Sequence, residues 1–360
     1  MEHKYNYVIF DDNEDSFYKD TLLDFYKLSN VKVVNPPLSD KSGLVRLLFK
    51  IHVSEKTAKI IKLPFKRIWR KHLFKNTFLN SKPMCFMFCN SLYKLRWTGF
   101  FEYLKKEYPG CKLVYYCRDL FKYCFSRYKR FEPEYLYKTF DYVLTYDMKD
   151  SIKYGLTFYS DFETIHDSPI SCTIDNKVVF VGAARDRLDT ILNVFRLLKS
   201  KGVKCDFYVT GVPKEKRFVE EGIVFADKWL DYKEVIKKVM SSSCVLEVIQ
   251  GDSYGYSARA MKAIGYNKKL ITNSLAVKHT RFYKQKGIVY FNDIENIDVD
   301  FIKNGKMPNY HYMNEFSPIS IISYMEYLFC GGTPEDFYCN WFNLVSYKNE
   351  ILNIEKEIKL

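Results

Sequence analysis

Residues 244–273 read CVLEVIQGDSYGYSARAMKAIGYNKKLITN, and their pattern is that of a strand, a loop, a helix and a second strand. The apolar run at 244–249 predicts a buried strand. A loop with two glycines follows it, and a short helix is expected over 257–265. The apolar run at 270–272 predicts the next strand. A strand–helix–strand unit of this kind favours a parallel sheet with helices packed on its faces.

The same alternation extends through most of the chain, whose 360 residues are enough for two domains of ordinary size. The segment 160–176 interrupts it, because this segment is polar, contains a proline and has no clear periodicity, so we interpret it as a linker. Before the linker, helices are expected over 97–107 and 148–154. After it, helices are expected over 187–201 and 232–241, and further helices over 319–329 and up to about residue 357. Strands are expected at 7–10, 31–34, 84–89, 112–117 and 142–146 before the linker, and at 177–181, 205–210, 244–249, 270–272 and 288–290 after it.

The composition indicates a protein that binds anions. The net charge is +13, and hydrophobic residues make up 47% of the chain, so there is ample material for packed cores. Nucleic acid, a phospholipid surface and a phosphorylated substrate are all compatible with this charge. The ten cysteines are scattered without a CxxC pair, which predicts reduced, buried thiols in a cytosolic protein. The first residues, MEHKYNYVIFDDNED, do not resemble a signal peptide, and no run reaches the ~18 apolar residues of a membrane-spanning helix.

The loop in 178-VVFVGAARDRLDTI-191 has features of an anion site. A strand leads into Gly182 and two alanines, and small residues let a ligand approach the backbone closely. Free amide groups at the start of the next helix attract phosphate, and Arg185 or Arg187 could add a bidentate contact. The alternative is an ordinary tight turn with solvated arginines.

The loop after residue 247 has a similar composition. Glu247 ends a strand, Gly255 relaxes the loop, Ser257 is placed to cap the helix, and Arg259 lies on its first turn. Amides, a hydroxyl and a guanidinium could therefore surround an anion, and a diphosphate needs several such donors to converge. A capped helix with glycines that merely form a turn is the alternative.

Polar residues also follow the strands of the first half. Asp11, Asn90, Arg118 with Asp119, and Asp147 each come directly after a strand. Ligands of open α/β sheets bind beyond the carboxyl ends of the strands, so these side chains could line one wall of a cleft. A carboxylate there could act as a general base towards a hydroxyl. Strand ends are also polar simply because they meet water.

The segment 56-KTAKIIKLPFKRIWRKHLFK-75 combines basic residues with apolar and aromatic ones, including Trp69. This combination suits an anionic membrane surface. No nucleic-acid-binding motif accompanies it, so we expect no nucleic-acid partner. The alternative is a solvated basic face over a stripe of core residues. The six histidines show no metal-ligand spacing, and we expect neither a metal nor another cofactor.

The second half resembles the bacterial two-domain (GT-B) glycosyltransferases of capsule and lipopolysaccharide assembly. The resemblance is carried by 140-FDYVLTYDMKDSIKYGL-156, 178-VVFVGAARDRLDTILNVFRLLKSKGVKCDFYV-209, 244–273 and 288-IVYF-291. The first 130 residues resemble this group only weakly. The implied fold is α/β, with two Rossmann-like domains facing a cleft and C-terminal helices crossing back to the first domain. The domains would be 1–170 for the acceptor, 171–312 for the nucleotide-sugar, and 313–360 for the closing helices.

The resemblance also implies roles for individual residues. The donor would be a nucleotide-sugar and the acceptor a hydroxyl of a surface-glycan precursor, which we expect to be lipid-linked. The protein would then be cytoplasmic and peripherally associated with the inner face of the membrane through residues 56–75. Asp11 is the expected general base, with Asp119 second. The expected donor-binding residues are Gly182, Arg185, Arg187, Glu247, Gly255, Ser257 and Arg259, and the expected acceptor-binding residues are Asn90, Arg118 and Asp147.

One position departs from the pattern of this group. The residue three after the helix arginine is commonly a glutamate that can bind the ribose, and here it is Lys262. The Glu-x7-Glu arrangement of many retaining members is also absent, because Gly255 follows Glu247 by eight residues. Two alternative functions therefore stay open. One is a nucleotide-sugar hydrolase or epimerase on the same fold, and the other is a non-catalytic glycan- or polyanion-binding protein with a degenerate donor site.

Overall fold

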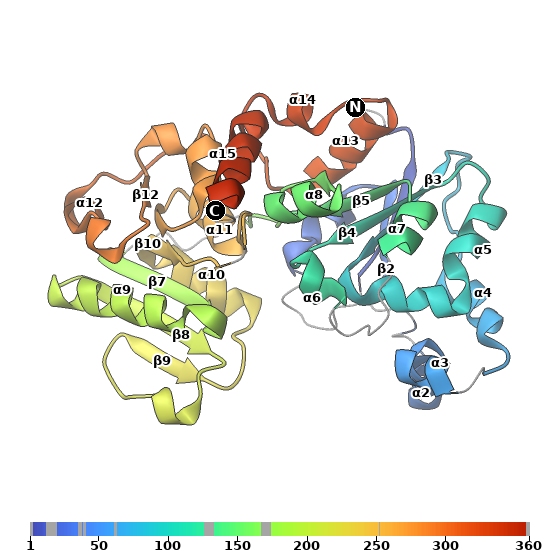
Figure 1. The fold of residues 1–360 in the computed structure, drawn as a ribbon, viewed down its shortest axis with the longest axis horizontal. Helices are drawn as coiled ribbons and strands as arrows, with labels where there is room; N and C mark the ends of the chain where they lie inside the picture. Colours follow the sequence, from blue (N-terminus) through green and yellow to red (C-terminus); the bar gives the residue numbers. More distant parts are fainter. Residues whose placement is uncertain are drawn as a thin grey trace.

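The computed structural model describes residues 3–11, 20–34, 38, 41–60, 63–125, 133–166, 174–251 and 253–357, without the side chains of 58–60, 90–91 and 174–175. Figure 1 shows two α/β domains beside each other, with the last helices above and between them. Each domain has one six-stranded sheet, and all strand pairs are parallel. The predicted fold class is confirmed.

The first sheet has nearly fully buried central strands, because helices cover both of its faces. These strands therefore read as continuous apolar runs, as in MCFMFC at 84–89. Its strand order is β2-β1-β3-β4-β5-β6. The strands are β1 (Asn6–Phe10), β2 (Val31–Val34), β3 (Met84–Cys89), β4 (Lys112–Cys117), β5 (Tyr142–Thr145) and β6 (Thr157–Phe158).

The second sheet has the order β12-β11-β10-β7-β8-β9, so the chain reverses direction across the sheet next to β7. Ligands of such sheets bind at the carboxyl ends of the strands, beside this reversal. The loops after β7 and β10 lie there. The strands are β7 (Ile174–Ala183), β8 (Lys204–Thr210), β9 (Ile223–Ala226), β10 (Ser242–Glu247), β11 (Lys269–Thr272) and β12 (Ile288–Tyr290).

Many helices begin at the capping residue that the sequence supplies. The Asp147, Asp231, Ser257 and Thr333 side chains each accept a hydrogen bond from a backbone N–H in the first turn. The helices are α2 (Gly43–Val53), α3 (Glu55–Ile60), α4 (Trp69–Leu73), α5 (Phe100–Glu107), α6 (Phe121–Phe125), α7 (Pro133–Thr139), α8 (Met148–Tyr154), α9 (Leu188–Ser200), α10 (Tyr232–Met240), α11 (Ala258–Gly265), α12 (Val299–Asn304), α13 (Pro318–Phe329), α14 (Pro334–Tyr338) and α15 (Leu344–Glu357). The 3-10 helices are η1 (Leu23–Lys27), η2 (Lys66–Ile68), η3 (Asn90–Thr98), η4 (Arg185–Arg187), η5 (Lys214–Lys216), η6 (Leu275–His279), η7 (Tyr283–Gln285) and η8 (Ile294–Asn296).

The C-terminal helices cross back to the first domain, as expected. The Tyr324 hydroxyl in α13 donates to the Phe158 carbonyl at 2.6 Å. In α15, Glu355 pairs with Lys149 of α8 at 2.7 Å, while Glu350 of the same helix pairs with His279 of the second domain. The largest apolar cluster accordingly contains residues of both sheets and of these helices. This shared core ties the two domains together.

The structure differs from the prediction at several boundaries. Strands β6 and β9 were not predicted, because β6 has two residues and β9 is a short edge strand that is only partly buried. β7 begins at Ile174 and therefore extends back into the predicted linker. Residues 97–107, expected as one helix, are divided between η3 and α5 at Gly99, whose φ of 64° lies in the left-handed region.

The cysteines in the described residues are all free, and most of them are buried, in line with the prediction. Cys330 and Cys339 are exposed, and Cys172 lies outside the described residues. In the part of the chain that the structure describes, none of the helices is both long and apolar enough to cross a bilayer.

Candidate active site

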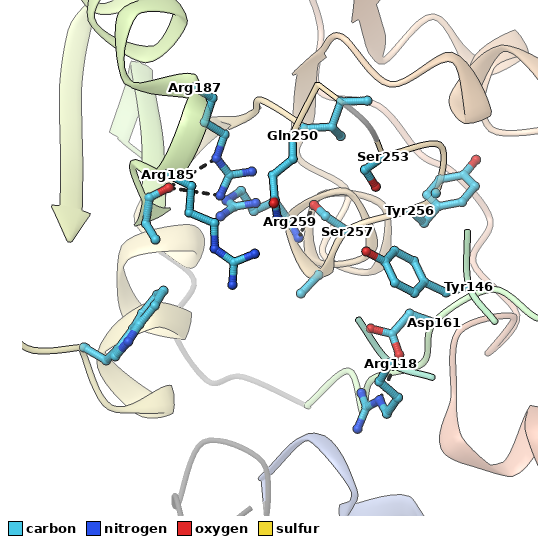
Figure 2. A pocket seen from close by; sticks show the side chains of 15 residues that line it. Arg118, Tyr146, Asp161, Arg185, Arg187, Gln250, Ser253, Tyr256, Ser257 and Arg259 are labelled. Carbon is cyan, nitrogen blue, oxygen red and sulfur yellow. Dashed lines mark hydrogen bonds and ion pairs between the residues drawn. The ribbon is translucent and has the colours of Figure 1, made fainter. Parts of the chain in front are cut away.

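A cavity of about 210 Å³ lies between the two domains, at the carboxyl ends of the strands. Figure 2 shows Arg185, Arg187 and Arg259 from the second domain on one side of it. Arg118 and Asp161 from the first domain lie on the other side. The two loops that the sequence indicated as anion sites therefore form one wall of a single cavity.

Arg259 on the first turn of α11 is held against strand β7. Its Nε donates to the Val181 carbonyl at 2.9 Å, and its guanidinium lies 5.0 Å from the centre of the Phe180 ring. A Cβ at position 182 would lie 2.1 Å from Nη2 of Arg259, so Gly182 provides the space that the guanidinium occupies. Gly182 is therefore needed because a side chain at this position would collide with the Arg259 guanidinium. This differs from the expected role, in which a ligand approaches the backbone of Gly182.

Arg187 is buried and uses its guanidinium within the protein. Its Nε and Nη2 donate to the Ala183 carbonyl at 3.2 and 3.1 Å, and Nη1 donates to the Val248 carbonyl. These bonds join the loop after β7 to the loop after β10. Arg187 still lines the cavity, but its main contacts fix the shape of the wall.

Arg185 has the opposite character, because its side chain is exposed at the cavity. Within the described residues its guanidinium forms no hydrogen bond or ion pair. Its φ of 45° lies in the left-handed region, which a non-glycine residue adopts at a cost of about 1 kcal/mol. This backbone conformation brings a side chain with five free N–H donors to the cavity mouth.

Arg185, Arg187 and Arg259 form the arginine wall of the cavity, where positive charges repel one another. Burial is the main cause that lowers the pKa of Arg259 to about 9; the charges of Arg187 and Arg185 act in the same direction, and Glu247 opposes them. Burial followed by Arg185 likewise lowers the pKa of Arg187. An anion placed in the cavity would relieve this repulsion, so the wall is suited to a phosphate or diphosphate.

Ser257 caps α11, as the sequence predicts, with its Oγ accepting from the Arg259 N–H at 3.2 Å. Glu247 does not reach the cavity, which corrects its expected role in donor binding. It is fully buried and accepts hydrogen bonds from the Ser257 N–H, the Ser257 hydroxyl and the Thr272 hydroxyl. Burial raises the pKa of Glu247 above its ordinary value, and these hydrogen bonds offset only part of the rise. Its role is to position Ser257 and the start of α11.

Asp147 was expected to bind the acceptor, and the structure corrects this. The residue is fully buried, and its Oδ1 caps α8 by accepting from the Asp150 N–H at 3.0 Å. Its Oδ2 accepts from the Tyr254 N–H at 2.5 Å and from the Ser253 hydroxyl at 3.3 Å. Asp147 thus holds the loop of the second domain against the first.

The same contact involves Gly255. A Cβ there would lie 2.7 Å from the Tyr146 carbonyl oxygen, so only glycine fits against the first domain at this point. The Met148 N–H donates to the Tyr254 carbonyl at 2.9 Å and completes the junction. We call residues 253–255 with 146–148 the interdomain junction.

The first-domain wall contains Arg118. Its Nε pairs with Asp161 at 3.0 Å, and its Nη2 donates to the Phe162 carbonyl. Burial lowers the pKa of Arg118, but Asp161 and weaker interactions, including that with Asp11, together raise it above its ordinary value, so the guanidinium stays charged. Asp119 interacts electrostatically with both Arg185 and Asp161, although it is not among the residues that line the cavity.

Asp11 and Asn90 were also expected at the site. Asp11 is only 1% exposed at the end of β1 and does not line the cavity, so the structure does not place the expected general base at the site. The side chain of Asn90 lies outside what the structure describes.

Lys262 lies next to the site and faces inward. It forms a buried ion pair with Glu163 of the connection between the domains, and the Tyr232 hydroxyl donates to the same carboxylate oxygen at 2.7 Å. Lys262 therefore has its own partner. The sequence pattern led us to expect an acid at this position, and the ion pair with Glu163 gives Lys262 a role that does not require a degenerate site.

Several lining residues were not found from the sequence: Tyr146, Asp161, Trp229 and Gln250. Tyr146 adjoins the predicted Asp147 and could have been found from the strand end. Asp161 lay within the predicted linker, and Trp229 belongs to a loop without a motif. Across the described residues, no group of three or more His, Cys, Asp or Glu side chains is placed to hold a metal ion.

Comparisons with known proteins identify the fold. No protein-family model and no curated protein matches the chain. An alpha-glucosyltransferase solved with UDP-glucose and DNA containing an abasic site has a TM-score of 0.56 and 10% identity, covering 90% of this chain and 98% of that one. Another alpha-glucosyltransferase structure, with UDP and a 13-mer DNA containing a HMU base, gives 0.55 and 11% over 89% and 98%.

A third match, α,α-trehalose 6-phosphate synthase from Burkholderia multivorans, has a TM-score of 0.44 and 8% identity, covering 99% of this chain and 97% of that one. The first two likenesses cover about nine tenths of the chain, so they include parts of both domains. They show that the chain has the two-domain GT-B fold.

Proposed function

We propose that the protein is a glycosyltransferase that binds a nucleotide-sugar in the interdomain cavity. The observation that carries this proposal is the convergence of Arg185 and Arg259 with the capped start of α11 on one cavity. These groups supply charge-assisted donors for a diphosphate. The matching alpha-glucosyltransferases were solved with UDP or UDP-glucose, which supports a donor of this class.

The charge of the leaving group explains why arginines line the donor side of the cavity. When the glycosidic bond to the donor breaks, negative charge grows on the diphosphate, and donors fixed in advance stabilise that charge. Arg259 is rigidly held, while Arg185 can close on the ligand from the exposed side. We propose that these two residues do this without a metal ion, and that activity persists in EDTA.

The acceptor hydroxyl needs a base on the opposite wall. Asp119 is the better placed of the two expected carboxylates, because it interacts with Arg185 and Asp161, which both line the cavity. Burial raises the pKa of Asp119, which makes it a stronger base than an exposed carboxylate. We propose that Asp119 accepts the proton of the acceptor hydroxyl and that Arg118 contacts the acceptor.

We further propose that the acceptor is a lipid-linked precursor of a surface glycan and that the protein works at the cytoplasmic face of the membrane. The support is the basic, aromatic segment 56–75 in the acceptor domain, from which Lys66 lies over the ring of Trp97 in the neighbouring η3. A cationic, amphipathic surface suits an anionic lipid.

A thermal-shift panel of UDP, GDP, CMP, dTDP and ADP, run in EDTA, tests the donor site. A nucleotide at 100 times its Kd should add about 2.7 kcal/mol to the free energy of unfolding. Arg185→Ala should abolish most of this shift. The matched control is Arg196→Ala, because Arg196 is an exposed arginine on α9 away from the cavity.

A clear shift with one nucleotide, lost in Arg185→Ala and kept in Arg196→Ala, supports the proposal. Release of free sugar or of isomerised donor without an acceptor would instead indicate a hydrolase or epimerase. No shift with any nucleotide would contradict the donor site and favour a polyanion-binding protein, whose binding falls steeply with salt.

A further inference from the structure

Helix α2 has apolar residues on two faces, and only one face is used by the fold. Phe49 and Val53 are buried in the first domain, where Phe49 packs against Trp69 at 5.3 Å between ring centres. On another face, Leu44, Leu47, Leu48 and Ile51 are exposed. Their spacing of i, i+3, i+4 and i+7 forms one continuous stripe along the helix. We call these four residues the leucine stripe.

The exposure of this stripe is large. Leu44 is 69% exposed and Leu47 is 55% exposed. Single exposed leucines are common, but a contiguous apolar stripe on a helix marks an interaction surface. The burial of Phe49 and Val53 keeps the helix in place, so the stripe has a fixed orientation relative to the domain.

The surroundings of the stripe are strongly basic. Between residues 41 and 75, Glu55 is the single acid among many Lys and Arg residues. Lys50 on α2 is exposed, as are Arg67 and Lys71 near the second apolar group of Phe65 and Ile68. The Trp69 Nε1 donates to His52 of α2 at 2.7 Å, which holds the segment that carries the second group against α2.

The location of α2 connects this surface to the cavity. The helix follows β2 and packs against η3, which follows β3. Both strands are parallel neighbours of β1, so α2 lies at the carboxyl edge of the first sheet, the edge on which the cavity opens. In Figure 1, α2 and α3 lie together beyond this edge, apart from the C-terminal helices.

The chemistry favours one partner. A nucleic acid would engage the Lys and Arg residues but leave the leucines in water. A second copy of the chain would bring two basic surfaces together and create repulsion. An anionic bilayer satisfies both features, because acyl chains accept the leucines while headgroups pair with the cations.

We propose that α2 lies in the interface of an anionic bilayer, with the leucine stripe among the acyl chains. The Lys and Arg residues around it then contact the lipid headgroups. This inference deepens the proposed function, since it places the carboxyl edge of the acceptor domain at the membrane, where a lipid-linked acceptor is found. The docking itself requires no catalysis.

Flotation with vesicles tests the inference. One set of vesicles is phosphatidylcholine alone, and the other also contains about 30% of the anionic lipid phosphatidylglycerol. The test variant combines Leu44→Gln, Leu47→Gln and Leu48→Gln. The matched control is Leu79→Gln, because Leu79 is 104% exposed and adjoins Asn80, which bonds to Asn6 at the opposite edge of the sheet. All proteins are first checked for unchanged melting temperature and, without vesicles, for the nucleotide shift.

The expected result is that the wild type and Leu79→Gln float with anionic vesicles, while partitioning of the triple variant falls at least about tenfold. Equal flotation of the triple variant, or no flotation of the wild type, would overturn the inference. So would a wild-type dimer that becomes monomeric in the triple variant without vesicle binding, or duplex-DNA binding without vesicle binding. Because nucleotide binding is measured separately in solution, a failed donor site and a failed membrane surface are distinguishable.

Discussion

The three arginines at the cavity use their guanidinium groups differently, and substitutions should separate them. Arg259→Ala should lower turnover about a hundredfold or more, because one fixed donor to the leaving group is lost. Arg185→Ala should weaken nucleotide binding with little change in melting temperature, since its guanidinium is exposed. Arg187→Ala should lower the free energy of unfolding by about 1–3 kcal/mol, because the Ala183 and Val248 carbonyls lose their donors.

The measurements are kcat and KM with the donor identified by the nucleotide panel, together with urea unfolding. Full turnover in Arg259→Ala would remove this residue from the catalytic machinery. An Arg185→Ala protein that unfolds early would show that Arg185 supports the fold instead of a ligand.

The buried pair of Lys262 and Glu163 gives a second prediction at this scale. Lys262→Met should lower the free energy of unfolding by about 3–5 kcal/mol, because it leaves a carboxylate buried without its cation. Adding Glu163→Gln to Lys262→Met should restore much of the loss. Urea unfolding of both single variants and the double variant measures the coupling, and additive losses would contradict the pairing.

Sequence reasoning at the residue scale succeeded where a local rule applies. Ser257 was expected as a cap because capping depends on neighbouring backbone N–H groups. We expected Glu247 and Asp147 to bind ligands, yet both accept hydrogen bonds from other segments of the protein: Glu247 from Thr272 of the next strand, and Asp147 from Tyr254 of the second domain. The pairing of Lys262 with Glu163 was invisible for the same reason, because ninety-nine positions, the difference between 262 and 163, separate them.

At the scale of elements, Asp147 at the start of α8 makes the stability of the protein depend on pH. Burial, followed by the charge of Asp150, raises the pKa of Asp147 from 3.8 to about 7. The folded protein therefore holds this proton more tightly than the unfolded chain. The contribution of Asp147 to stability is complete below about pH 4 and is lost as the pH rises to about 7, by up to about 1.4 kcal/mol per pH unit.

Asp147→Asn should flatten the decline of stability between these pH values, since an amide does not ionise. Urea unfolding from pH 4 to pH 8 measures the slope. Asp189→Asn serves as the control, because Asp189 is an exposed carboxylate on α9. Equal slopes for wild type and Asp147→Asn would show that Asp147 is not the group responsible.

Most elements were predictable from apolar runs, and those that were missed have a physical reason. The central strands of both sheets are buried on both faces, so their apolar runs mark them clearly. The edge strand β9 is partly exposed and lacks such a run. The basic segment was noticed from its charge, but the leucine stripe precedes it and becomes visible only when the exposed and buried faces of α2 are separated.

For the whole molecule, the alternation of strands and helices indicated two α/β units, and the resemblance added the GT-B arrangement with its returning helices. The distances between domains could not be predicted, because they depend on contacts between residues far apart in the chain. The pairing of α15 with both α8 and η6 is one such contact. The cavity exists only where these contacts bring the two walls together.

The interdomain junction has a consequence for recombination between related proteins. The donor loop takes its shape partly from the first domain, through Asp147, Met148 and the close fit of Gly255 against Tyr146. A chimera that exchanges the second domain at the linker would separate these partners. Domain shuffling, whether in evolution or in engineering, should therefore preserve residues 146–148 and 253–255 as one inherited unit.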